Sequence, residues 1–226
     1  MRTALITGAS RGIGAAIARD LGRDHHVLVG ATTADGAQAI VDELPDAAPF
    51  VVDLTDAAAL AEAVAGIDSL DVLVHSAGIA PYLPVAESTP QQWREAFDLN
   101  VFAVAELTRL LLPALRTARG TLVAINSGSG HHSGANNAIY SGTKFALRAF
   151  TDALRAEEQG RLRVTSVHPG RVDTDMQVTL QSDMGNHNYD GSRYVRPESI
   201  AAAVRLAVDA TDDAVVQDIS VRPSGL

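Results

Sequence analysis

The chain contains no cysteine, which excludes disulfide bonds, thiolate nucleophiles and thiolate metal sites. Its seven histidines never occur at His-x-x-x-His spacing, so we expect no metal site. No apolar run approaches the roughly 18 residues that a membrane-spanning helix needs, so we expect no membrane partner. A nucleic-acid partner is not expected either, because 18 Lys and Arg face 27 Asp and Glu and the net charge is −9.

Linker-like stretches rich in Pro, Gly or Ser are absent, as are internal repeats. The 226 residues therefore fit one domain, residues 1–226, which is large enough to bury a substantial apolar core. The first residues run straight into an apolar strand and leave no room for a signal peptide. Together with the missing cysteines, this predicts a cytoplasmic protein.

Short apolar runs typical of strands alternate with segments of helical periodicity. Such alternation predicts a single doubly wound, Rossmann-type α/β domain, with a seven-stranded parallel sheet, helices on both faces and ligands at the carboxyl ends of the strands. Between 171 and 196 the apolar periodicity disappears, which predicts a substrate loop or short helical lid. We expect strands at 3–7, 26–30, 49–52, 70–74, 121–125, 164–167 and from Ala214, and helices at 13–21, 37–44, 56–65, 89–115, 139–158 and 197–208.

A glycine-rich turn follows the first strand, with the sequence Thr7-Gly8-Ala9-Ser10-Arg11-Gly12-Ile13-Gly14. Gly8, Gly12 and Gly14 suit a turn at which the backbone approaches a diphosphate closely. The free N–H groups and the dipole of the following helix then favour its negative charge. An ordinary glycine-rich helix start is the alternative, and the flanking strand and helix favour the nucleotide site.

The end of the second strand bears on the choice between NADP and NAD. An acidic residue there would pair with a ribose 2′-hydroxyl and select NAD, but the segment reads Gly30-Ala31-Thr32-Thr33. Arg11 and the hydroxyls of Thr32 and Thr33 would instead meet a 2′-phosphate, so NADP(H) is preferred and NAD(H) stays possible. Arg11 as a solvated surface charge is the alternative. Asp53 either accepts from the adenine amino group or caps a turn.

A phenol and an ammonium, Tyr140 and Lys144, lie one helical turn apart on the helix expected at 139–158. A phenol near pKa 10 is a poor acid or base at neutral pH, and a nearby ammonium and a positive nicotinamide ring would lower its pKa. Ser127 ends the fifth strand, from which its hydroxyl can hydrogen-bond a substrate oxygen. In isolation, Tyr-x-x-x-Lys is more often a surface pair. The combination with a nucleotide cradle predicts carbonyl and alcohol redox chemistry.

These motifs, in this order, resemble the short-chain dehydrogenase/reductase family over essentially the whole chain. Lys144 would then also bind the nicotinamide ribose, and Asn100 would hold a water in a proton relay. The matching segments are Thr7 to Gly14, Asp53-Leu54, His75-Ser76-Ala77-Gly78, Asn100, Ser127, Tyr140 with Lys144, and Pro169-Gly170-Arg171-Val172-Asp173-Thr174. The resemblance implies a catalytic tetrad of Ser127, Tyr140, Lys144 and Asn100, and cofactor contacts from Gly8, Ser10, Arg11, Gly12, Ile13, Gly14, Asp53, Leu54, Ala77, Gly78, Tyr140, Lys144, Pro169, Gly170, Val172 and Thr174.

The chain departs from the family pattern at His75, where the family has asparagine. His75 is expected to replace a structural asparagine rather than to add a catalytic base. His131 and His132 follow the catalytic-serine strand and either line the pocket or lie in an exposed loop. The segment from 171 to 196 carries four residues that either form an apolar lid or anchor a flexible loop: Met176, Met184, Tyr189 and Tyr194.

The resulting hypothesis is an NADP(H)-dependent oxidoreductase that interconverts a carbonyl and a secondary alcohol, with Tyr140 as general acid and base. Its partner is a small-molecule substrate. The alternative is an NADP-binding regulatory or sensor protein without turnover. Related enzymes commonly pair their two long helices, here those bearing Trp93 and Phe97 and the Tyr140 motif, so we also expect a homodimer or homotetramer.

Overall fold

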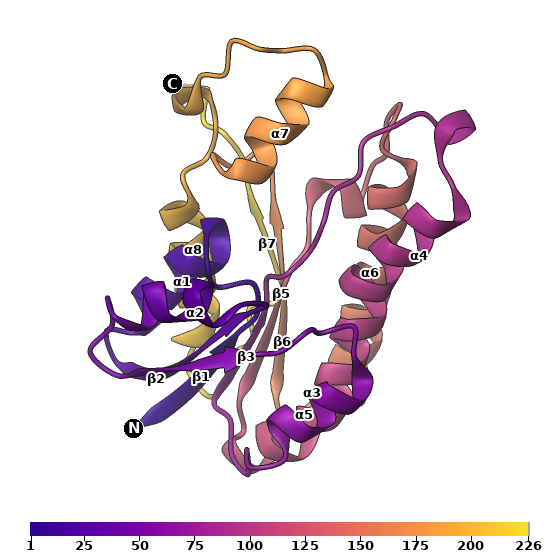
Figure 1. The fold of residues 1–226 in the computed structure, drawn as a ribbon. Coiled ribbons are helices and arrows are strands. Elements are labelled where there is room, and N and C mark those ends of the chain that lie inside the picture. The colour runs from indigo at the N-terminus through magenta and orange to yellow at the C-terminus, as the bar shows by residue number, and fades with distance from the viewer. Residues whose placement is uncertain (226) are drawn as a thin grey trace.

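The fold, given by a computed structural model, is described for residues 1–225. Seven parallel strands form one sheet in the order β3-β2-β1-β4-β5-β6-β7 (Figure 1). The doubly wound, Rossmann-type architecture expected from the alternation of strands and helices is thereby confirmed. The strands are β1 (Arg2–Ile6), β2 (His25–Ala31), β3 (Ala47–Val51), β4 (Val72–His75), β5 (Thr121–Ile125), β6 (Arg163–Pro169) and β7 (Asp218–Val221).

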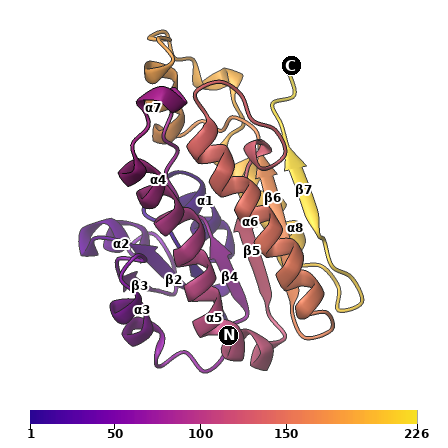
Figure 2. The same ribbon diagram turned by 90° about the vertical axis from the view of Figure 1, so that its right-hand side faces the viewer.

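Helices cover both faces of the sheet (Figures 1 and 2). One face carries α1 (Gly12–Leu21), α2 (Ala34–Val41) and α8 (Pro197–Val208), and the other carries α3 (Ala57–Val64), α5 (Ala103–Ala118) and α6 (Ala138–Glu157). None of the helices formed by residues 1–225 combines the length and apolarity that a membrane crossing requires.

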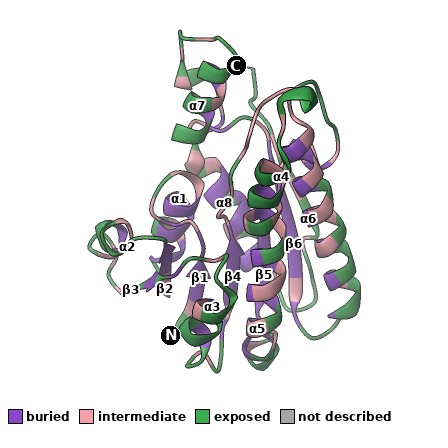
Figure 3. Cartoon of the chain, turned by 45° about the vertical axis from the view of Figure 1, so that its right-hand side comes forward, coloured by how far each residue is buried: buried purple, intermediate pink, exposed green. Residues whose placement is uncertain are grey.

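Neighbouring residues of the central strands contribute to opposite cores, because successive side chains of a strand point to opposite faces. Ile6 and Val74 belong to the core under α1 and α8, whereas Leu5 and Leu73 belong to the core under α3 and α5. All four are fully buried, as the purple central strands of Figure 3 show. This two-sided burial explains why these strands read as continuous apolar runs in the sequence.

The prediction of a single unbroken helix at 89–115 was wrong in one respect. α4 (Pro90–Phe97) passes through a π-helical turn (Asp98–Phe102) into α5, so the helix contains a widened turn. Such turns accommodate one extra residue and occur often at functional sites. Here the turn buries Asn100, which is 1% exposed. Apolar periodicity does not reveal one added residue, so the sequence predicted an unbroken helix.

The seventh strand begins at Asp218 rather than at Ala214, where it was expected. Its register is set by β6, in which Ser166 lies opposite Asp218 and Pro169 lies opposite Val221. Just before β7, the carbonyl of Val216 accepts a hydrogen bond from the Thr165 hydroxyl at 2.6 Å rather than from a strand amide. The apolar run that predicted a strand therefore forms an exposed loop that leads into β7.

A short helix, α7 (Asp175–Asp183), forms within the segment expected to be a loop or lid. After α7, the rings of Tyr189 and Tyr194 stack with centroids 5.2 Å apart, and the Tyr189 hydroxyl donates to Asp173 at 2.7 Å. Met176 and Met184 are 45% and 41% exposed. The segment is therefore anchored by its two tyrosines and not by its methionines.

Candidate active site

The glycine-rich turn forms a close-packed cradle between β1 and α1. Gly8 and Gly12 have φ of 63° and 55°, in the region that favours glycine. A Cβ at Gly14 would lie 2.2 Å from the carbonyl oxygen of Gly8, so a side chain cannot fit there. The Arg11 side chain does not cap α1, and the first N–H groups of the helix therefore suit an anionic ligand.

Thr7 joins the ends of β1 and β4, the two strands between which the strand order reverses. Its amide donates to the carbonyl of Val74 at 2.9 Å. Its hydroxyl accepts from the amides of Ser76 and Ala77 at 3.0 and 3.2 Å. A doubly wound sheet binds its ligand at this switch point, so Thr7 shapes the crevice without any charge of its own.

A cavity of about 390 Å³ opens at this switch point. Twelve residues expected to bind the cofactor line it, whereas the remaining five, Tyr140, Lys144, Pro169, Gly170 and Val172, lie outside its lining. The twelve are Gly8, Ser10, Arg11, Gly12, Ile13, Gly14, Thr32, Asp53, Leu54, Ala77, Gly78 and Thr174. Sequence reasoning missed several further lining residues, among them Phe50, Val52, Ser76, Ile79 and Leu99. Ser76 lies inside the matching segment His75-Ser76-Ala77-Gly78 but was not among the expected cofactor contacts, and Leu99 lies in the π-helical turn. No motif marks the apolar residues Phe50, Val52 and Ile79.

The part of the cavity expected to select the cofactor contains one exposed ion pair. Arg11 lies 3.6 Å from Asp175 at the start of α7, and both side chains are mostly exposed. The Thr33 hydroxyl caps α2 by accepting from the Gly36 amide, whereas Thr32 lines the cavity. The guanidinium of Arg11 and the threonine Thr32 therefore both line the part of the cavity that is expected to select the cofactor.

Asp53 forms the turn cap, one of the two roles between which the sequence could not decide. Its Oδ1 accepts from the amide and the hydroxyl of Thr55 at 2.9 and 2.7 Å, which is a turn cap. These hydrogen bonds lower the pKa of the carboxyl group, so it is ionised at neutral pH. Both recorded bonds end on Oδ1, and Asp53 also lines the cavity, so the cap is compatible with a contact from Oδ2.

Ser127, Tyr140 and Lys144 meet where β5 ends beside α6. The Lys144 ammonium is buried, donates to the Ile125 carbonyl at 2.9 Å and lies 5.7 Å from the centroid of the Tyr140 ring. The Ser127 Oγ accepts from the Ser129 amide at 3.1 Å, which leaves its own hydrogen free to donate. The fold thus brings the side chains of Tyr140 and Lys144, one helical turn apart on α6, next to Ser127.

The pKa of Tyr140 is raised by the protein alone, whereas the expected lowering relied on the ammonium together with a positive nicotinamide ring. Burial raises this pKa above the ordinary value, and a hydrogen bond with Ser127 offsets the rise only in part. Burial also lowers the pKa of Lys144 to about 8, because the ammonium loses its hydration. The protein groups alone therefore do not produce a phenolate at neutral pH.

Asn100 lies against the segment that follows β4. Its Oδ1 accepts from the Ile79 amide at 2.9 Å, and its Nδ2 donates to the Ile79 carbonyl at 2.8 Å and to the Thr143 hydroxyl at 3.1 Å. The side-chain amide is thus engaged on both atoms with protein partners. A water held by Asn100 would therefore bind the second lone pair of Oδ1 or the main chain, within the π-helical turn.

The residues expected at the nicotinamide end lie between β6 and α7. Thr174 caps α7, lines the cavity, and has a methyl group 3.4 Å from a Cβ placed on Gly12. Val172 is 5% exposed and pairs with Val195 beside α8. Pro169 and Gly170 continue β6 and contact the last strand, where the Gly170 amide donates to the Val221 carbonyl.

Of the candidate histidines, none lines the cavity. His75 is 3% exposed, its Nε2 is 2.9 Å from the Thr108 hydroxyl, and burial lowers its pKa to about 3. It is therefore a neutral structural group. His131 contacts His168, and His132 is exposed. Among residues 1–225, no three His, Asp or Glu side chains are grouped so that they could hold a metal ion.

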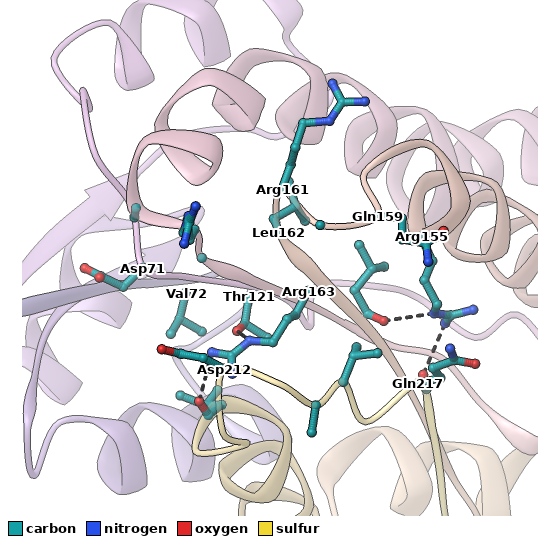
Figure 4. Close-up of a pocket in the computed structure, with 18 of the residues that line it drawn as sticks. Asp71, Val72, Thr121, Arg155, Gln159, Arg161, Leu162, Arg163, Asp212 and Gln217 are labelled. Atoms are coloured by element: carbon teal, nitrogen blue, oxygen red, sulfur yellow. Dashed lines mark hydrogen bonds between the residues drawn. The ribbon is translucent and has the colours of Figure 1, made fainter.

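A second, larger cavity of about 740 Å³ lies at the opposite, amino-terminal end of the sheet (Figure 4). Its most buried guanidinium groups are already used within the protein. Arg155 donates to the carbonyls of Val164 and Gln217, and Arg163 donates to the Thr121 hydroxyl and to carbonyls at the end of α8. These arginines hydrogen-bond the segment between α8 and β7. The cavity is therefore a space between loops whose guanidinium groups already have structural partners.

Comparison with known proteins agrees with this geometry. The family model described as short chain dehydrogenase matches residues 2–185. Dehydrogenase/reductase SDR family member 11 of Gallus gallus is 31% identical over 245 residues, covering 99% of this chain and 96% of its own length. Serine 3-dehydrogenase of Agrobacterium fabrum is 32% identical over 208 residues, covering 88% of this chain and 83% of its own.

Two solved structures with bound nicotinamide cofactors superpose closely on this fold. An alcohol dehydrogenase from the archaeon Thermococcus sibiricus, complexed with 5-hydroxy-NADP, has a TM-score of 0.90 and 26% identity, covering 100% of this chain and 98% of that one. The closed form of a serine dehydrogenase complexed with NADP+ has a TM-score of 0.89 and 26% identity, covering 98% and 94%.

Proposed function

The chain belongs to the short-chain dehydrogenase/reductase family of oxidoreductases, and from this premise we propose that it interconverts a carbonyl and a secondary alcohol with NADP(H). One observation carries the proposal: the half-buried phenol of Tyr140 lies beside the buried ammonium of Lys144, which is 5.7 Å from the centroid of its ring. The chemistry needs one proton at the substrate oxygen and one hydride at its carbon. The protein groups present suit the proton half of that exchange.

The cradle fits a dinucleotide. It offers an uncapped helix terminus for a diphosphate and a turn that excludes any side chain at Gly14. NADPH, when bound, supplies the hydride to the carbonyl carbon. The Lys144 ammonium uses one hydrogen on Ile125, which leaves two for hydroxyl groups of the nicotinamide ribose.

During reduction, Ser127 orients the carbonyl by donating its hydroxyl hydrogen to the carbonyl oxygen. Tyr140 then gives its phenolic proton to that oxygen, and in oxidation it takes the proton back. The phenolate formed on Tyr140 is stabilised by the Lys144 charge, which is retained at neutral pH because the pKa of Lys144 stays near 8. Asn100 supports proton return through a water that it holds.

The test is consumption of NADPH and NADH against a panel of ketones, aldehydes, diketones and keto esters. Tyr140→Phe should lower kcat by at least about 1,000-fold while leaving the Kd for NADPH within about twofold, because the phenol moves the proton and supplies only one of the many expected cofactor contacts. Tyr194→Phe, which keeps its ring stacking, is the matched control and should retain activity. An active Tyr140→Phe protein would contradict the mechanism. NADPH binding without turnover across the panel would favour the sensor alternative.

We propose that the protein prefers NADPH to NADH because Arg11 and Thr32, which line the cavity, would bind the 2′-phosphate. Arg11→Ala should weaken NADPH binding about tenfold and leave NADH binding unchanged, since one charge-assisted hydrogen bond is worth about 1.5–3 kcal/mol. Asp175→Asn should strengthen NADPH binding, because it removes the carboxylate that competes for Arg11. Arg94→Ala, on α4, is the control. Equal loss of both cofactors in Arg11→Ala would refute the preference.

A homodimer or homotetramer is proposed through the outer face of α4, α5 and α6. Aromatic side chains gather there: Trp93 stacks on Phe97, and Phe102 and Phe145 are 59% and 46% exposed. Light scattering should give two or four times the 23.7 kDa of one chain. Phe145→Asp should lower that mass. The cytoplasmic location stays a prediction from the sequence.

A further inference from the structure

Three titratable side chains outside the cofactor cavity form one hydrogen-bonded row that ends at the catalytic serine. Asp218 Oδ1 lies 3.0 Å from His168 Nε2. On the other side of the same ring, His168 Nδ1 lies 3.1 Å from His131 Nε2 and 3.2 Å from the carbonyl oxygen of Ser127. The two imidazole rings have centroids 4.4 Å apart.

The row is built by the fold rather than by sequence proximity. His168 is fully buried in β6, Asp218 is half-exposed at the start of β7, and His131 follows the short 3-10 turn after β5. Figure 2 shows β6 and β7 side by side, with β7 at the edge of the sheet. The carbonyl of His168 is held in turn by the Arg222 guanidinium, so the ring is fixed from the strand side as well.

The chemistry of the partners dictates what His168 can do. A carboxylate only accepts, so Asp218 keeps a proton on Nε2 of His168. The Ser127 carbonyl also only accepts. A singly protonated ring therefore presents a lone pair to that oxygen, and an imidazolium presents an N–H. Addition of a proton to His168 thus turns the 3.2 Å contact with Ser127 from an unfavourable one into a hydrogen bond.

His131 complements this change because its Nε2 can either donate or accept. When His168 is singly protonated, His131 can donate to its Nδ1; when His168 is an imidazolium, a neutral His131 shares the one Nδ1 hydrogen with the Ser127 carbonyl. Burial and then the neighbouring His168 lower the pKa of His131, and Arg148 on α6 and His132 act in the same direction, whereas Asp218 raises it. A second proton on the pair is therefore disfavoured, because two adjacent imidazolium rings would repel one another.

We propose that Asp218, His168 and His131 form a positioning unit for Ser127, in which the protonation state of the histidine pair sets how firmly the Ser127 carbonyl is held. The inference rests on the proposed function, because it matters to turnover only if Ser127 orients the substrate oxygen. The unit acts through the Ser127 main chain and touches neither substrate nor cofactor. It adds a protonation step to the pH dependence of kcat, separate from that of Tyr140.

The kinetic test uses the full-length enzyme and a panel substrate at saturating NADPH, between pH 5 and 9. Asp218→Asn should move the acidic inflection of kcat down by about one pH unit, because it removes the anion that favours the imidazolium. His168→Asn keeps a neutral donor near the Nδ1 position, so it should retain most of kcat and lose that inflection. His168→Leu should lower kcat about tenfold and leave the Kd for NADPH unchanged. Asp212→Asn is the control for a lost exposed charge.

An NMR measurement of the Ser127 carbonyl tests the inference without any need for turnover. Protein labelled with 13C at serine carbonyls and 15N at glycine amides reports the Ser127 carbonyl through Gly128, and Ser127→Ala assigns the signal. The carbonyl shift should titrate with the same midpoint as the His168 ring, and Asp218→Asn should move both together. A Ser127 carbonyl that does not titrate with His168, or an Asp212→Asn effect as large as that of Asp218→Asn, would overturn the proposal. A titrating carbonyl in a protein without turnover would uphold the positioning unit and refute the proposed function.

Discussion

Asn100 and Ile79 are joined by two reciprocal hydrogen bonds: the Ile79 amide donates to Asn100 Oδ1, and Asn100 Nδ2 donates to the Ile79 carbonyl. The pair ties the π-helical turn to the segment after β4. The backbone of that segment lines the cofactor cavity, so the asparagine fixes the shape of the cavity through a residue that no motif marks. A third bond, to Thr143, extends the tie to α6.

Replacement of Asn100 by Ala should therefore cost stability as well as activity. It removes the three hydrogen bonds that the buried Asn100 side chain makes to Ile79 and Thr143, at about 0.5–1.5 kcal/mol for each. Urea unfolding of the cofactor-free protein should show a loss of about 2–4 kcal/mol. Asn188→Ala, at an exposed position after α7, is the control. A protein with wild-type stability and no activity would show that Asn100 acts only in the reaction.

Gly14→Ala tests the cradle. Its methyl group would lie 2.2 Å from the Gly8 carbonyl oxygen, so the turn must open. We expect a loss of about 1–3 kcal/mol in stability and at least tenfold weaker NADPH binding. Gly66→Ala has nothing within 4 Å of its added methyl group and should change neither quantity. If NADPH titration gave the same Kd for both variants, the turn would not be the diphosphate site.

Lys144 is the only lysine in the sequence, so protein labelled with 13C at lysine Cε gives one side-chain signal to titrate. The expected midpoint is about 8, because burial lowers the pKa of this ammonium from 10.5. A midpoint near 10.5 would show that the ammonium is solvated. The control is the same titration in urea, where the unfolded chain should give the ordinary value.

The same pKa shift predicts the effect of Lys144→Met on stability. Below pH 8 the ammonium is protonated in both states, and its burial costs about 3 kcal/mol. Between pH 8 and 10.5 the unfolded chain binds more protons than the folded one, so wild-type stability rises with pH. Lys144→Met should be about 2 kcal/mol more stable at pH 7, after the lost bond to Ile125, and the gap should narrow by pH 9.5. Arg148→Met, one turn along α6, should show no such pH dependence.

His75 predicts part of the acid sensitivity of the fold. Its pKa is about 3 when folded, against 6.5 when unfolded, so below pH 6.5 the unfolded chain takes up a proton that the folded chain excludes. Its contribution is complete above pH 6.5 and falls as the pH drops, by roughly 3 kcal/mol at pH 4.5. His75→Asn should lose less stability between pH 7 and 4.5 than wild type, as measured by urea unfolding. The exposed His187→Asn should behave as wild type.

The sequence by itself determined the fold class, the glycine cradle and the tyrosine–lysine pair. Each is a local pattern: strands at regular intervals, glycines where a Cβ cannot fit, and two side chains one helical turn apart. It also left Asp53 between two roles, because a turn cap and a ligand contact require the same residue type. Each of these features depends on residues that are close together in the chain, so a single sequence is enough to predict it.

Only the tertiary structure decided how distant segments meet. It placed Asn100 on Ile79 through a widened turn, seated β7 at Asp218 by its register with β6, and gave Tyr140 a raised pKa because burial outweighs its hydrogen bond. It also aligned Asp218, His168 and His131 from three separate segments. Such contacts depend on strand order and desolvation, which no local pattern encodes.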